Sequence, residues 1–331
     1  MGATFEELYE RRTGTYAKDA EGESFLRALN EHLEPRERAL YRDLAIEAPF
    51  LFVLGLPRSA TTLTSQLLAY CLDTGYVDNV AARFWLAPVH GIRLSRELLG
   101  EARPQARFES DYARTFDLHG IHEFGYFWRR WLKKESFADV ANARELEDEI
   151  DWEGLRLTLA NMQDALGGRA VAAKNILASY HLPRLRETLG KVVYVYVERD
   201  PLDAAVSILD ARRKYYEDPR TWWSYTPPEV EELLELDEWG QVAGQVHYLQ
   251  RLYEQSLPEA GLDVVVRTTY EEIAERPRRL LDAVAERSRE AHGADIAVVQ
   301  EPPERFPFRT HEGRDEDKER FRALLDELAA G

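Results

Sequence analysis

The sequence contains a single cysteine, Cys71, among its 331 residues. One thiol cannot form an internal disulfide, and it disfavours a metal site built from thiolates. Cys71 falls within an apolar helical pattern, which predicts a buried position in the core. The sequence also has no apolar run long enough to span a bilayer, and its N-terminus, MGATFEELYERRTG, lacks the apolar segment of a signal peptide. We therefore expect a cytoplasmic protein with no membrane span.

Basic residues are in the minority, with 43 Lys and Arg against 60 Asp and Glu, a net charge of −17. A surface this acidic disfavours nucleic acid, heparin-like polymers and anionic membranes as the main partner. Any anion site must then be a local basic pocket in a surface that otherwise repels anions. The length and the 44% of hydrophobic residues predict one large α/β domain over residues 1–331, with helical elaborations.

Four apolar runs predict buried strands at residues 49–57, 169–175, 191–200 and 262–269. The segments between them have helical patterns, including an N-terminal extension over residues 1–47 and an aromatic-rich insert over residues 81–165. Strands separated by helices pair in parallel through right-handed crossovers. We therefore expect a three-layer fold of the P-loop NTPase type. The N-terminal helices are expected to pack against this domain or against a second subunit, so a homo-oligomer is possible.

The segment LGLPRSATTLTSQLL (54–68) follows the first strand and opens a helix. It resembles the nucleotide-binding pattern G-x-x-x-x-G-K-[ST], but Ala60 replaces the second glycine and Thr61 the lysine. Amide groups at such a turn bind anions together with the helix dipole. The alternative is a polar helix cap beside a chance arginine. The anion site would be formed by Arg58, Ser59, Ala60, Thr61 and Thr62.

A second anion-binding pattern, RDPLDAAVS, follows the strongest strand, which ends in YVERDP. Arg199 leaves that strand, and Ser207 lies about two turns into the next helix. A Mg-nucleotide site would need a metal-holding Asp here, but Asp200 precedes Pro201 and is as easily a helix cap. Because ligands of open α/β sheets bind beyond the carboxyl ends of the strands, we expect a ligand with two phosphate-like groups, held without a metal.

The segments PRSATTL and RDPLDAAVS together resemble the sulfotransferases that use 3′-phosphoadenosine 5′-phosphosulfate (PAPS). In that family P-[KR]-[ST]-G-T-[TS] binds the 5′-phosphosulfate, and R-D-P-x-D-x-x-x-S binds the 3′-phosphate. The resemblance covers about residues 49–285 and includes TTYEEIAERP, which is similar to a later Y-E-D-L segment. It implies PAPS as cofactor, with residues 58–62 at the 5′ group and Arg199 with Ser207 at the 3′-phosphate. Ala60 departs from the family's glycine.

The resemblance also implies catalytic roles. Sulfuryl transfer needs positive charge at the leaving oxygen and a base for the acceptor hydroxyl. Arg58 and Lys174 are the candidates for the charge, although Lys174 at a strand end could simply reach water. Glu123 and His122 are weighed equally as the base, and His119 less, because the places that family members use for the base hold other residues here.

Other residues of the insert stay ambiguous. Most of its aromatic residues are expected in the core, although they could line an acceptor pocket. Arg83, Arg129 and Arg130 could bind an anionic acceptor or the nucleotide, or only offset the acidic surface, and we place them outside the site.

The sequence therefore predicts metal-independent transfer of a sulfuryl group to a hydroxyl, or less readily an amine, of a small or carbohydrate-like acceptor. Two alternatives remain: a Mg-dependent P-loop kinase, and a non-catalytic member of the family that binds nucleotide.

Overall fold

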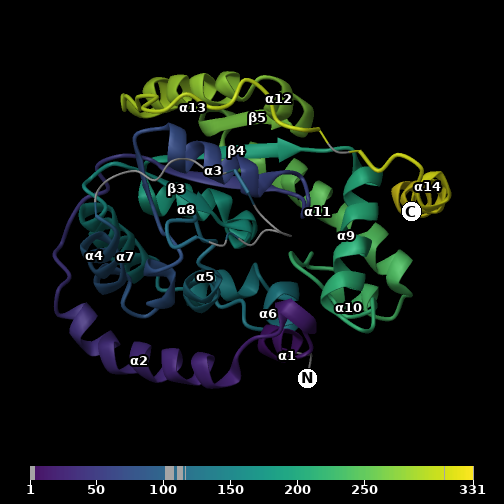
Figure 1. Cartoon of the computed structure of the whole chain (residues 1–331), viewed down its shortest axis with the longest axis horizontal. Helices are drawn as coiled ribbons and strands as arrows, with labels where there is room; N and C mark the ends of the chain where they lie inside the picture. The colour runs from purple at the N-terminus through teal and green to yellow at the C-terminus, as the bar shows by residue number, and fades with distance from the viewer. Residues whose placement is uncertain (1–3, 101–107, 110–114, 116, 309, 331) are drawn as a thin grey trace.

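The computed structural model describes residues 4–100, 108–109, 115, 117–308 and 310–330. A parallel sheet with the strand order β2-β3-β1-β4-β5 lies at its centre (Figure 1). The strands are β1 Phe50–Gly55, β2 Thr74–Tyr76, β3 Ala170–Lys174, β4 Val192–Glu198 and β5 Val265–Thr269. The predicted α/β fold with a parallel sheet is confirmed, and β2 adds a short edge strand that the sequence analysis did not predict.

The central strand β1 decides where the functional loops meet. It pairs with β3, where Val53 lies opposite Lys174, and with β4, where Gly55 lies opposite Val197. All six residues of β1 are buried, as its continuous apolar run predicts. The carboxyl ends of β3, β1 and β4 therefore lie side by side, and the segments that follow them share one edge of the sheet.

Helices cover both faces of the sheet. Leu51 and Val53 face one core, which α3 and α13 complete, while Phe50, Phe52 and Leu54 face the other. The helices on the first face are α3 Thr61–Cys71, α12 Tyr270–Glu275 and α13 Pro277–His292. Those that build the second core include α7 Trp152–Ala165, α8 Leu182–Leu189, α9 Pro201–Tyr215 and α11 Glu238–Ala260. Cys71 is buried in the first core, as predicted.

The helical segment after β5 is divided in two, α12 and α13. Thr269 caps α12 in a reciprocal capping box with Glu272. Pro277 then begins α13 at its first turn, and Arg276 before it has the non-helical angles φ −142° and ψ 61°. A proline excludes the helical conformation from the residue that precedes it, which explains the break.

The N-terminal extension and the insert form the wall below the sheet in Figure 1. The first helix packs on the insert, because Thr4 forms a β-bridge with Ser136 and the Phe5 ring lies 5.3 Å from that of Phe137. The elements are α1 Phe5–Glu10, α2 Ala20–Arg38, α4 Pro88–Leu99, α5 Gly125–Trp131 and α6 Phe137–Ala141, with 3₁₀ turns at Gly14–Tyr16, Ala81–Arg83 and Glu145–Glu149. Both segments are largely helical, as expected for their described parts.

The remaining elements complete the second layer and the C-terminus. They are α10 Val230–Leu233, α14 Asp315–Ala330 and the 3₁₀ turns Ile176–Tyr180 and Leu262–Val264. The amphipathic α14 packs on α9 and α11 at the right of Figure 1. Over the described part of the chain, each helix is too short or too polar to cross a bilayer.

Candidate active site

The loop after β1 turns back sharply over the end of the strand. Gly55 has φ 149°, and a Cβ there would lie 2.6 Å from both the Ser59 hydroxyl and the Val197 carbonyl oxygen, so a side chain would not fit. The buried Ser59 hydroxyl donates to the Leu56 carbonyl at 2.8 Å and holds the turn closed. Left-handed residues within such a turn gather amide groups into an anion-binding nest. The contacts at Gly55 are the protein's own packing, in which the Gly55 amide donates to the Tyr253 hydroxyl at 3.1 Å.

Ala60 holds the conformation that a glycine would adopt more easily. It precedes the first residue of α3 and has φ 71°, in the left-handed region, and Arg58 has φ 70°. That region costs an L-residue with a Cβ roughly 1–2 kcal/mol. The first amides of α3 have no acceptor within the helix and point into the loop. The departure from the glycine of the family motif thus leaves the shape of the loop intact and adds local strain.

The second anion-binding segment lies directly beside this loop. Arg58 Nε donates to the Ser207 hydroxyl at 3.0 Å, and Arg199 donates to the carbonyl oxygen of Arg58. Asp200 caps α9 by accepting from the amide of Asp203 at 2.9 Å, so it is a structural cap. Burial lowers the pKa of Arg199, and the nearby Arg58 charge adds to the effect. Two guanidinium groups this close favour binding of a strong anion.

Lys174 joins the loop to the insert. It ends β3, its side chain is 6% exposed, and its ammonium group donates to the Thr62 hydroxyl at 2.8 Å. The same ammonium forms an ion pair with Glu123. Glu123 is half-exposed and lies just before α5. Thr62, Lys174 and Glu123 therefore form a continuous polar chain that leads from the anion loop to the neighbouring cavity.

His122 lies beside this chain in a fixed tautomer. Its Nδ1 accepts a hydrogen bond from the backbone amide of Phe124 at 2.8 Å. His122 is exposed, but the atoms packed around it disfavour its charged form. The positive charges of Lys174 and Arg83 disfavour that form further. Together they lower the pKa of His122 to about 4, although the Glu123 carboxylate acts in the opposite direction. A neutral ring that accepts at Nδ1 has its proton on Nε2. His122 is thus arranged as a hydrogen-bond donor at neutral pH.

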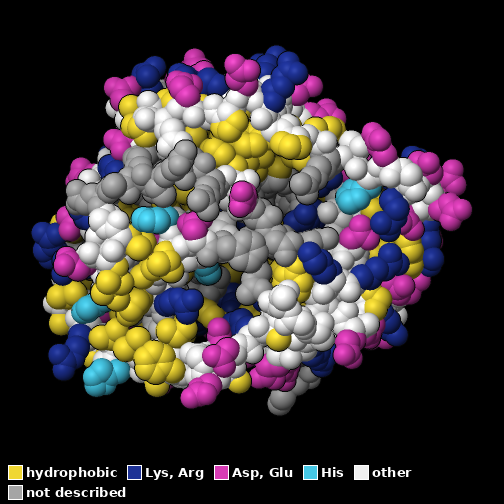
Figure 2. Space-filling model, viewed as in Figure 1, with side chains coloured by type: hydrophobic (Ala, Val, Ile, Leu, Met, Phe, Trp, Pro, Cys, Tyr) yellow, Lys and Arg dark blue, Asp and Glu magenta, His cyan; other side chains and the backbone are white. Residues whose placement is uncertain are grey.

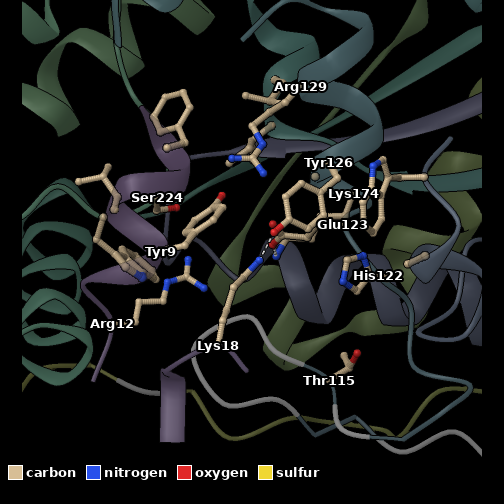
Figure 3. Close-up of a pocket in the computed structure, with 18 of the residues that line it drawn as sticks. Tyr9, Arg12, Lys18, Thr115, His122, Glu123, Tyr126, Arg129, Lys174 and Ser224 are labelled. Carbon is tan, nitrogen blue, oxygen red and sulfur yellow. Dashed lines mark hydrogen bonds and ion pairs between the residues drawn. The ribbon is translucent and has the colours of Figure 1, made fainter. Parts of the chain in front are cut away.

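A cavity of about 700 Å³ opens next to Glu123 and Lys174 (Figure 3). Segments far apart in the sequence line it, from the N-terminal extension, the insert, the region after β3 and the stretch 215–226. Many lining residues are aromatic: Tyr9, Trp85, Tyr126, Tyr215, Trp223 and Tyr225. Cavities of this size and character hold small organic molecules. The polar chain therefore connects the loop after β1 with a cavity of the size that a small organic molecule needs.

Comparison with known proteins agrees with this arrangement. A family model described as "Sulfotransferase family" matches residues 49–289, which include both anion-binding segments, Lys174 and Glu123. The chain belongs to the sulfotransferase family. A search of curated proteins gave no match.

Among solved structures, two mycobacterial sulfotransferases are similar to this sulfotransferase. STF9 from Mycobacterium avium is 16% identical over 91% of this chain and 72% of its own, with a TM-score of 0.44. STF1 from Mycobacterium tuberculosis H37Rv is 13% identical over 90% of this chain and 81% of its own, with a TM-score of 0.46.

The structure of this sulfotransferase also shows where the other candidate residues of the insert lie. His119 is half-buried on a turn and is not among the described residues that line the cavity. Phe124, Phe127 and Trp128 are in the core, as expected for most of these aromatics, whereas Tyr126 lines the cavity.

The sequence analysis also missed Tyr9, Arg12 and Lys18 of the N-terminal extension, which line the same cavity, and placed Arg129 outside the site although it lines the cavity too. The only local signal was the mixture of aromatic and basic residues in LYERRTGTYAK.

Proposed function

We propose that this sulfotransferase moves a sulfuryl group from PAPS to a hydroxyl group of a small or medium-sized acceptor in the 700 Å³ cavity. The polar chain from Thr62 through Lys174 to Glu123 carries this proposal, because it joins the donor loop to the acceptor cavity. A non-catalytic nucleotide-binding protein would not need such a connection.

The residues of the two anion-binding segments fit the donor. The left-handed residues Arg58 and Ala60 shape the loop, and the first amides of α3, which have no acceptor within the helix, would receive the 5′ group. Arg199 and Ser207 would hold the 3′-phosphate. Both residues contact Arg58, so the two anion-binding segments are neighbours. Arginines form paired, charge-assisted hydrogen bonds with phosphate oxygens and need no metal to do so.

The donor supplies the sulfuryl group and leaves as adenosine 3′,5′-bisphosphate. Glu123 removes the proton of the acceptor hydroxyl, whose oxygen then bonds to sulfur while the bond from sulfur to the phosphate oxygen breaks. Lys174 and Arg58 stabilise the negative charge on that oxygen. His122 donates from Nε2 and helps to orient the acceptor, since its Nδ1 is already engaged by a backbone amide.

Calorimetry with adenosine 3′,5′-bisphosphate in EDTA tests donor binding. We expect binding in the absence of metal, with a strong loss of affinity in Arg199→Ala. Because a charge-assisted hydrogen bond contributes about 1.5–3 kcal/mol, the loss should be about tenfold or more. Arg267→Ala is the matched control, because Arg267 lies on β5 in an exposed ion pair with Glu198.

Two results would contradict the proposal. Binding of ATP that requires Mg²⁺ and shows no preference for a 3′-phosphate would indicate the kinase alternative. Tight binding of the bisphosphate without sulfuryl transfer to any hydroxylated acceptor would indicate a non-catalytic member of the family.

A further inference from the structure

Arg129 is a buried cation in the wall of the acceptor cavity. Its residue is 5% exposed, it lies on α5, and it lines the cavity. Its Nε and Nη1 atoms have no hydrogen-bond partner among the described residues. Figure 3 shows the guanidinium group directed toward Tyr9 and Tyr126. A buried cation whose N–H groups lack hydrogen-bond partners destabilises a fold. Its position in a cavity wall therefore indicates a ligand that accepts those hydrogen bonds.

The rings around Arg129 hold it in place without neutralising it. Its guanidinium carbon lies 4.8 Å from the centre of the Tyr9 ring and 4.9 Å from that of Tyr126. Arg12 also lies over the Tyr9 ring, at 4.2 Å from its centre, and its Nε also lacks a described hydrogen-bond partner. Two guanidinium groups thus converge on one aromatic ring at the edge of the cavity.

Two carboxylates of the neighbouring cavity wall, Glu23 and Asp19, are engaged elsewhere. Glu23 accepts from Lys18 at 2.9 Å and from the Tyr126 hydroxyl at 2.6 Å, which neutralises Lys18 rather than Arg129. Asp19 caps α2 by accepting from the Glu21 amide. Within the described part of the chain, Arg129 forms no ion pair, although its charge influences Glu135 through space. The positive charge of Arg12 and Arg129 therefore remains for a ligand.

This cationic pair lies on the same wall as the proposed base. Arg129 is four residues, about 6 Å of helix rise, beyond Gly125, and Glu123 lies two residues before Gly125. Figure 2 also shows Lys and Arg side chains within the hollow, while side chains of both charges are spread over the outer surface. One small molecule could then reach Glu123 with its hydroxyl and Arg129 with an anionic group.

We propose that the acceptor is a hydroxylated carboxylic acid whose carboxylate is bound by Arg129, with Arg12 supporting it, while its hydroxyl faces Glu123. This inference rests on the proposed function and specifies its acceptor class. A planar guanidinium group matches the two oxygens of a carboxylate, and the aromatic walls accept the apolar body of the molecule. The pair is distinct from Arg58 and Arg199, which lie beyond the sheet edge with the donor loop.

The test measures acceptor binding to the protein saturated with adenosine 3′,5′-bisphosphate. The probes are 4-hydroxybenzoate, 4-hydroxyphenylacetate, 3-(4-hydroxyphenyl)propionate and 12-hydroxydodecanoate, each paired with its uncharged methyl ester. We expect at least one acid to bind about tenfold or more tightly than its ester, the effect of a charge-assisted hydrogen bond. 4-Hydroxybenzenesulfonate separates carboxylate recognition from general attraction of anions.

Variants show whether Arg129 is responsible. In Arg129→Gln the preference for the acid over the ester should disappear, while the affinities for the bisphosphate and for the esters are kept. Arg129→Lys should retain part of the preference for the acid. Arg130→Gln is the matched control, since Arg130 is on the same helix, is 53% exposed and pairs with Glu34. It should keep the full preference.

The inference is overturned if no acid binds better than its ester, or if Arg129→Gln and Arg129→Lys both keep the preference. It is also overturned if the sulfonate binds as tightly as every acid. Failure of the wild type to bind the bisphosphate would contradict the proposed function instead, and the paired probes are then compared in the nucleotide-free protein by the same criteria.

Discussion

Ala60 is the residue at which this chain departs from its family and at which a single methyl group has a measurable cost. Its φ of 71° is natural for glycine and strained for alanine. We expect Ala60→Gly to raise the free energy of unfolding by up to about 1 kcal/mol, because relief of the strain exceeds the added flexibility of the unfolded chain. The same change should tighten binding of adenosine 3′,5′-bisphosphate.

Urea denaturation and calorimetry check this prediction. The matched control is Ala69→Gly within the same helix, where Ala69 is buried and not in a left-handed conformation. That change should destabilise the protein by about 1 kcal/mol. Equal destabilisation by both substitutions would contradict the assigned strain.

Glu123 and His122 are neighbours with different expected roles. Glu123→Gln should lower kcat by about 10²- to 10⁴-fold, the usual contribution of a general base, and leave the affinity for the bisphosphate unchanged. His122→Asn should lower kcat far less, because the Nδ1 atom of His122 accepts from a backbone amide and its pKa of about 4 keeps it neutral. Release of the bisphosphate product measures both rates. A greater loss in the His122 variant would transfer the role of base to the imidazole.

At the scale of elements, α14 supports the helix that carries Ser207. Lys318 on α14 pairs with Asp203 on α9 at 2.8 Å, and the amide of His311 also donates to that carboxylate, at 3.2 Å. Phe321 anchors α14, since it is fully buried with its ring 4.9 Å from that of Trp239 on α11.

Phe321→Ala should therefore lower the free energy of unfolding by about 3–5 kcal/mol through the lost burial and the cavity that it leaves. Phe25→Ala on α2 is the control, because Phe25 is 65% exposed, and it should change stability by no more than about 0.5 kcal/mol. Thermal and urea unfolding distinguish the two. A small effect of Phe321→Ala would mean that α14 is held mainly by its ion pairs.

The elements that the sequence predicts well are those with a strong local pattern. The apolar runs of β1 and β4 and the loop between β1 and α3 follow from consecutive residues. The strand β2 has only three residues, too few for any periodicity, and its position depends on pairing with β3. The break before α13 has a local signal, Pro277 itself, but the amphipathic pattern on both sides of the proline favours one helix.

The residues of the candidate site also differ in how well the sequence predicts them. The residues of the two anion-binding motifs could be found because each motif is contiguous. Arg12 and Lys18 could not, because more than a hundred residues separate them from Glu123 and tertiary packing, including that of α1 on α6, brings them to the cavity. The sequence favours Glu123 and His122 equally as the base. In the structure Glu123 pairs with Lys174, whereas the Nδ1 of His122 accepts from the backbone amide of Phe124.

For the whole molecule, the net charge of −17 surrounds the site that we propose for anions. Small anions can enter because the local cations outweigh the distant surface charges, which salt screens beyond about 8–10 Å. A long polyanion must instead lie across the acidic exterior. We expect the protein to pass through a heparin column at 0.15 M salt and to bind a quaternary ammonium anion exchanger. Retention on heparin would argue for a polymeric acceptor.

In the proposed function, the donor-binding segments and the acceptor cavity come from separate parts of the chain, since Tyr9, Arg12 and Lys18 line the cavity but are not among the residues that a Cβ at Gly55 would meet. Under that proposal, the range of acceptors and the transfer chemistry are separable. A library randomised at Tyr9, Arg12 and Lys18 would sample new acceptors without disturbing the transfer apparatus, which makes this short N-terminal segment the natural starting point for redirecting the enzyme.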